Sequence, residues 1–322
     1  MVAGRWRVLV VSLALLVAGP LVAQARAADL DAYNAGEGGA QGLAPGQTWA
    51  QTFVAGRSGG LTLLRLPIMA VPDEDATTRG DLRVSIRTAS DGTVVRANGY
   101  DWVDSAVIPR PDDAVLASAT IPGASVALFS WDSPTTIDVA FDLPAQVTAG
   151  SKYAFVIEVL GGNTRYYWMI SNTFDFDGYP AGTILFVGQP GAWYDYGYQV
   201  SLEAPPRFGH IYHYDGLFET YVATPSQQVA SIGDTVAALD PTPGVGGALT
   251  GPTGTVNANR RDVLVDALAR AAEWIAAGDF QLARAQLNQV LGKCDGVGMD
   301  WVSGPTAVAL AAQIRAILAT LP

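Results

Sequence analysis

The pattern of hydrophobic and polar positions changes once along this chain. Between residues 47 and 222, short runs alternate apolar and polar side chains, as in residues 82–87, which read Leu-Arg-Val-Ser-Ile-Arg. From residue 260 onward, apolar residues recur every three or four positions. A two-residue repeat is typical of strands with one wet face, and a 3.6-residue repeat is typical of amphipathic helices. The pattern therefore predicts a mainly β protein with a small all-α C-terminal domain.

The alternating region predicts about nine or ten short strands, separated by Gly, Pro, Asn and Asp, as in an antiparallel sandwich. We expect an antiparallel jelly-roll β-sandwich over residues 47–222. Asp91-Gly92 is expected to turn a hairpin, and residues 98–113 are expected to form a long loop. On the strand that begins at Tyr166, Trp168 should share a face with Tyr166 and fill the core.

Three helical stripes follow in residues 260–322, and they predict a three-helix module. Gly278 ends the first helix, and Pro305 stands at the favoured first position of the third. Residues 223–259 contain many Gly and Pro and predict a flexible linker, while residues 28–46 predict a loose leader segment.

The first 27 residues have the organisation of a signal peptide. Arg5 and Arg7 precede an apolar run from Val8 to Val17, and residues 25–27 read Ala-Arg-Ala, a cleavage signature. The apolar run is shorter than the roughly 20 residues that a membrane-spanning helix needs. We therefore expect cleavage before Ala28 and a secreted or extracytoplasmic protein, with no membrane insertion after cleavage; an uncleaved N-terminal anchor is the alternative.

The charge of the chain excludes some partners. Without residues 1–27, which hold three Arg and no acid, the chain has 16 basic and 30 acidic residues, a net charge of −14. Nucleic acid and anionic lipid are both bound through Lys and Arg, so neither is an expected partner.

Cys294 is the only cysteine, so the chain has no intramolecular disulfide and depends on its hydrophobic core. We expect Cys294 to be a small buried side chain near a helix end. Intermolecular pairing or reactivity is the alternative.

Two family resemblances rest on particular residues. The first is carried by Gln51-Thr-Phe53, Trp131, Ala149-Gly150 with Tyr153-Ala154 and Ile157, Tyr166-Tyr-Trp168, and Asp215 with Phe218-Glu-Thr-Tyr221. With these, residues 47–222 resemble bacterial exported jelly-roll domains that are carbohydrate-binding-module-like and largely uncharacterised. The resemblance implies a sandwich fold and a binding role.

The second resemblance covers residues 260–322. It is carried by Leu264, Leu268, Ala271, Gly278, Ala283, Leu287, Asp295-Gly296, Asp300-Trp301-Val302, Gly304 and Leu310. This tail resembles the FIMAH-like helical module found at the C-terminus of secreted bacterial proteins. The resemblance implies an accessory or interaction role, and a protein partner could dock on Trp274 or Trp301 if these rings are exposed.

An aromatic-rich stretch is the candidate binding site. Trp193, Tyr194 and Tyr196 lie between Gly191 and Gly197, which predicts a loop that presents flat rings. Sugar recognition uses such rings together with polar side chains at the rim. The candidate ligand-binding residues are Trp193, Tyr194, Tyr196, Asp195, Tyr167 and Arg165. The alternative is that these rings fill the core of the fold.

No metal is assigned, and no cofactor is expected apart from a structural Ca²⁺ that stays open. Loop carboxylates can bind Ca²⁺, and the candidates here are Asp73, Glu74 and Asp75, or Asp175 and Asp177. His210 and His213 are too few to hold a metal, although Asp215 could add a third ligand.

The sequence thus favours an exported, non-catalytic protein whose sandwich binds a glycan or a cell-surface polymer, with the helices as an accessory module. No nucleophile elbow and no phosphate-binding loop occurs. Two alternatives stay open. One is a structural or assembly protein of the envelope or extracellular matrix, and the other is a glycan-active hydrolase with paired carboxylates.

Overall fold

The structure is a computed structural model, and it describes residues 28–36, 38–71, 79–98, 101–131, 133–174, 179–187, 192–201, 210–244 and 248–322. The predicted signal peptide lies outside these residues. The described chain divides into two compact units, one of Leu30–Val222 and one that contains Ala223–Pro322. We call them the β unit and the helical unit.

The strands of the β unit are mostly short. Their bounds are β1 Asp29–Asn34, β2 Gly38–Leu43, β3 Thr48–Val54, β4 Gly59–Leu66, β5 Ile68–Ala70, β6 Asp81–Asn98, β7 Asp101–Ile121, β8 Ile137–Val147, β9 Lys152–Leu160, β10 Tyr166–Phe174, β11 Ile184–Val187, β12 Trp193–Asp195, β13 Tyr198–Ser201, β14 His210–Gly216 and β15 Phe218–Ala223. They form three sheets with the orders β1-β15-β4-β8, β13-β14-β10-β2 and β12-β11-β3-β9-β6-β7. Every pairing between these strands with a described register is antiparallel except one.

One hydrophobic core joins the three sheets. Phe141 on β8, Phe155 on β9 and Trp168 on β10 all belong to it, and each is at most 1% exposed. The rings of Phe155 and Trp168 meet nearly edge to face at 5.6 Å. The predicted faces of β10 are confirmed, because Tyr166 and Trp168 are buried while Tyr167, between them, is half-buried.

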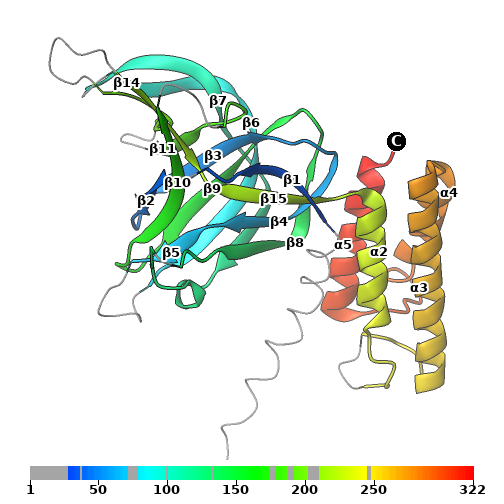
Figure 1. Ribbon diagram of the computed structural model, residues 1–322. Coiled ribbons are helices and arrows are strands. Elements are labelled where there is room, and N and C mark those ends of the chain that lie inside the picture. The colour runs from blue at the N-terminus through cyan, green and yellow to red at the C-terminus, as the bar shows by residue number, and fades with distance from the viewer. Residues whose placement is uncertain are drawn as a thin grey trace, which may run out of the picture. The chain divides into compact units, whose positions relative to one another are not determined.

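The sequence prediction was wrong about one hairpin. Asp91-Gly92 lies inside β6, where Asp91 pairs with Pro109 of β7, and the predicted loop 98–113 is largely strand. β6 and β7 thus form a long hairpin, drawn in cyan in Figure 1. Its register shifts near Arg87, as bulges do, and bulges bend a strand pair.

The bend lets the six-stranded sheet close on itself. The first half of β6 pairs with β9, and its second half pairs in parallel with β12, through Val95 opposite Tyr194 and Arg96 opposite Asp195. Because β12 also continues the order β11-β3-β9, these five strands form a closed ring. The pairing of β6 with β12 is the one parallel pairing, and the predicted all-antiparallel fold would not contain it.

Residues 28–46, predicted to be a loose leader, instead contain β1 and β2. β2 pairs with β10, so Gly39 lies opposite Ile170. The sequence pattern did not predict this strand, because its Ala and Gly residues give no clear alternation of large apolar and polar side chains.

The helical unit contains α2 Pro225–Ala237, α3 Gly254–Ala277, α4 Phe280–Leu291 and α5 Gly304–Thr320. The three predicted stripes are confirmed as the buried faces of α3, α4 and α5. The predicted linker 223–259 is corrected, since α2 lies within it and adds Val229, Ile232 and Val236 to the same core. Thr224 begins α2 with a capping box that includes Gln227.

Cys294 is buried in this helical core, as expected, and burial raises the pKa of its thiol to about 11. Among the helices that the structure describes, none has the length and apolar character needed to cross a membrane.

Candidate functional site

The predicted aromatic loop is mostly strand. Trp193, Tyr194 and Asp195 form β12, and the three aromatic residues of the stretch are half-buried. Tyr194 stacks on Phe186 with centroids 5.1 Å apart, and Tyr196 meets Trp49 edge to face at 5.2 Å. These rings therefore pack against the protein to a greater extent than a presented loop would allow.

The closed ring of strands has an apolar floor. Each of the five strands contributes one side chain to a small hydrophobic cluster: Ala50 of β3, Val94 of β6, Val156 of β9, Leu185 of β11 and Trp193 of β12. Ala106 and Ile108 of β7 pack against the same cluster. Trp193 thus serves as part of this floor.

Polar side chains stand two residues further along the same strands, toward one end of the ring. They are Thr52 of β3, Arg96 of β6, Thr183 just before β11, and Asp195 of β12. Because a step of two residues keeps a side chain on the same face, each points to the same side of its strand as the floor residue beside it. The interior of the ring thus changes from apolar to polar toward this end.

Asp195 is the centre of the polar layer, and its side chain is 1% exposed. Its Oδ2 accepts from Arg96 Nη2 at 2.7 Å and from Nε at 2.8 Å, and its Oδ1 accepts from Thr183 Oγ1 at 3.1 Å. Burial raises the pKa of Asp195, while the Arg96 guanidinium opposes that shift. Both carboxylate oxygens are therefore held by protein donors.

A cavity of about 390 Å³ opens above this layer, and we call it the ring-mouth pocket. Its lining comprises Thr52, Val54, Arg96, Ile108, Pro109, Lys152, Pro180, Ala181, Gly182, Thr183, Asp195, Gly197, His213 and Asp215. Seven of these fourteen residues are Thr, Arg, Lys, Asp or His, so the lining is more polar than that of a typical small-ligand site.

β14 supplies the second carboxylate of the pocket. Asp215 is 2% exposed, and its Oδ1 accepts from Gln51 Nε2 at 3.2 Å. Gln51 is itself fixed by the Gly216 N–H, which donates to Oε1 at 2.8 Å. His213 lies two residues before Asp215 on the same strand and is half-buried in the same lining. The backbone of His210 belongs to β14, but its side chain lies outside the described part.

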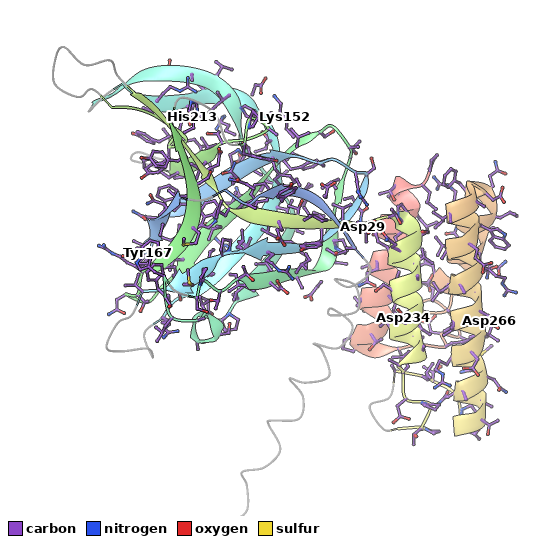
Figure 2. The ribbon with its side chains drawn as sticks, in the orientation of Figure 1. Asp29, Lys152, Tyr167, His213, Asp234 and Asp266 are labelled. Carbon is purple, nitrogen blue, oxygen red and sulfur yellow. The ribbon has the colours of Figure 1, made fainter. Side chains whose placement is uncertain are left out.

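The structure separates the predicted site residues into two groups. Asp195 lines the pocket, whereas Tyr167 and Arg165 belong to another surface, at and just before the start of β10. In Figure 2, His213 and Lys152 lie at one end of the β unit and Tyr167 lies at the other. Trp274 and Trp301, proposed as docking rings of the helices, are half-buried against the helical core.

The described residues contain no group of three His, Cys, Asp or Glu side chains arranged to hold a metal ion. The predicted Ca²⁺ ligands Asp73, Glu74, Asp75, Asp175 and Asp177 lie outside the described residues.

Sequence reasoning missed Arg96, Thr183 and Lys152. They are distant in sequence and meet only because the ring closes, so local patterns carry no signal for them.

No protein-family model matches this sequence, and a search of curated proteins likewise finds no match.

Proposed function

We propose that this chain is an exported, non-catalytic binding protein whose β unit is a sandwich of the jelly-roll type. In this proposal the ring-mouth pocket takes the end of a neutral glycan, and the helical unit is a FIMAH-like accessory module. The observation that carries the proposal is the polar pocket above the closed apolar floor of the strand ring.

The size and shape of the pocket favour a chain end over the middle of a polymer. Its volume of about 390 Å³ is at the low end for small-molecule sites, which span roughly 300–1,000 Å³. The cluster formed by Ala50, Val94, Val156, Leu185 and Trp193 closes the ring below. A ligand would therefore enter through the mouth and stop at the floor.

The charges of the lining favour a neutral ligand. Arg96 is paired with Asp195, and Lys152 Nζ lies 2.9 Å from Asp91 Oδ1. These cations are already compensated by protein carboxylates, so an anionic ligand would compete with existing pairs. A neutral polyol would instead exchange hydrogen bonds with these groups and place its C–H faces on Val54, Ile108 and Pro109.

A blocked pocket tests the proposal. Ala181 is exposed at the lining, and Ala181→Trp would fill the mouth without removing a hydrogen bond. We expect the full chain to bind neutral mono- or disaccharides on a glycan array, and the variant to lose at least about tenfold in affinity, close to 1.4 kcal/mol. Ala149→Trp, at an exposed turn outside the lining, is the matched control. Equal binding by both variants would refute the proposal.

A glycan-active hydrolase is the second candidate, and it is favoured by one observation. Asp195 and Asp215 are two buried carboxylates that line the same pocket. Against this candidate, both carboxylate oxygens of Asp195 already accept hydrogen bonds, from Arg96 and Thr183. These bonds suit a structural role better than the role of a proton donor. Release of reducing ends from the array hits, abolished by Asp215→Asn, would favour the hydrolase.

A further inference from the structure

A second surface of the β unit carries an exposed indole. Trp131 is 65% exposed, and the neighbouring Leu128 is 51% exposed. Single exposed apolar residues are ordinary, but a large exposed ring that is held in place by other rings is a feature of recognition surfaces.

Two other rings fix the position of Trp131. Phe129 meets Trp131 edge to face, with centroids 4.7 Å apart and planes at 84°. Phe129 also contacts Tyr167, with ring centroids 4.8 Å apart and ring planes at 64°. We call Phe129, Trp131 and Tyr167 the aromatic patch. The three rings form a continuous chain of contacts that runs from a strand of the sheet to the exposed indole.

The backbone beneath the patch is fixed as well. Phe129 N–H donates to the Ala70 carbonyl at 2.8 Å, and Ala70 N–H donates to the Ala127 carbonyl at 2.8 Å. Ala70 ends β5, and β5 pairs with β10, where Tyr167 lies opposite Met69. Because the segment is fixed by hydrogen bonds on one side and by ring contacts on the other, little conformational entropy remains to be lost on binding.

The residues next to the patch in sequence include polar side chains as well as the exposed Leu128. Ser130 is half-buried, Ser133 is exposed, and Arg165 is exposed just before Tyr167. An exposed flat ring with hydroxyl and guanidinium groups nearby in the sequence matches the C–H faces and hydroxyl edges of sugar rings. Protein interfaces also combine aromatic residues with polar groups, so the test below measures the oligomeric state as well.

We propose that the aromatic patch is a second carbohydrate-contact surface, on which Trp131 stacks against the flat face of a polysaccharide. The patch is distant from the ring-mouth pocket. Tyr167 lies six residues before Thr173, which pairs with His213, so the separation along β10 is about 20 Å. This proposal does not require the pocket to bind a chain end. Where both surfaces bind, one polymer could engage them together and gain avidity.

Adsorption of the full chain to insoluble cellulose and chitin tests the patch. We expect adsorption by the wild-type protein, and Trp131→Ala should lower its partition coefficient about tenfold. Tyr33→Ala is the matched control, since Tyr33 is 56% exposed in the same unit. Ala181→Trp should adsorb normally, which separates a failure of the patch from a failure of the pocket.

Three results would overturn the proposal. One is wild-type adsorption by Trp131→Ala, and another is failure of the wild-type chain to adsorb to either polysaccharide. The third is a change in oligomeric state of Trp131→Ala by light scattering, which would make the patch an interface between protein chains. Circular dichroism of Trp131→Ala, expected to match the wild type, shows that the variant is folded.

Discussion

Arg96 Nη2 lies 2.7 Å from Asp195 Oδ2, and the two residues are also register partners in the parallel pairing of β6 with β12. One ion pair thus spans the single strand pairing that closes the ring. The same pair forms the polar layer below the pocket, so closure of the ring and construction of the site depend on the same two side chains.

Removing the cation should destabilise the β unit more than removing the anion. Arg96→Met leaves a carboxylate that is 1% exposed without its guanidinium, whereas Asp195→Asn leaves an Arg whose side chain is 28% exposed and can reach water. We expect a loss of about 3 kcal/mol for Arg96→Met and about 1–2 kcal/mol for Asp195→Asn. Urea titration at pH 7 measures both, and the reverse order would contradict this account.

The loss in Arg96→Met should also depend on pH. Burial raises the pKa of Asp195 in the folded chain, so this group contributes most stability below its ordinary pKa of about 4. That contribution is lost as pH rises through the raised folded pKa. Without Arg96 the folded pKa rises further, so the deficit relative to wild type should be small near pH 4 and full at pH 7. A deficit that is constant from pH 4 to 7 would exclude Asp195 as its source.

Gly216 should tolerate no side chain. A Cβ at this position would lie 1.8 Å from Trp168 Cζ2, and Trp168 is fully buried. We expect Gly216→Ala to lower the free energy of unfolding by about 3 kcal/mol or to prevent folding. Gly39→Ala is the control, because Gly39 pairs with the same Ile170 from the other side and has open space around its Cβ position. Its effect should stay within about 0.5 kcal/mol. Calorimetry compares the two variants.

Alternation and helical periodicity predicted most of the elements, because both follow from one buried face per element. The α3, α4 and α5 stripes are cases of this kind. The same reasoning failed for α2, where Gly and Pro downstream suggested a linker while Val229, Ile232 and Val236 fill one helical face. Breakers mark where a segment ends, and they do not show that the residues before them are unstructured.

Truncation of Ile232 tests whether α2 belongs to the helical core. Ile232 is 1% exposed and borders a void of only about 10 Å³, so it is tightly packed. The neighbouring side chains therefore have little freedom to fill the space that a truncated side chain would leave. We expect Ile232→Ala to cost about 2–4 kcal/mol in the helical unit, measured by thermal unfolding. Ala230→Ser, at an exposed position of the same helix, should be near neutral. If α2 were only a linker, neither substitution would change the stability of the helical unit.

The site was harder to predict than the elements. Asp195 was identified for its place among aromatic residues, yet its role comes from Arg96, which is 99 residues away in sequence. Trp193 was expected to face solvent, but it packs with Val94 and Val156 on the floor of the ring. Both outcomes depend on the closure of the ring, and closure depends on a strand bend that alternation alone does not reveal.

The thiol of Cys294 should be unreactive in the folded chain. Its pKa of about 11 and its burial leave almost no accessible thiolate at pH 8. We expect thiol-disulfide reagents to react at least about a hundredfold more slowly with the native protein than with the protein in urea. Rapid native labelling would indicate that α4 and the residues after it open readily.

The position of the bound glycan decides whether the ring-mouth pocket is the binding site. Amide chemical shifts of the isotope-labelled full chain, titrated with the best array saccharide, report which residues the ligand meets. We expect saturable shifts at the amides of Thr183, Asp195 and His213 in the wild-type chain and none in Ala181→Trp. Binding with no shift at these three residues would contradict the assignment of the pocket.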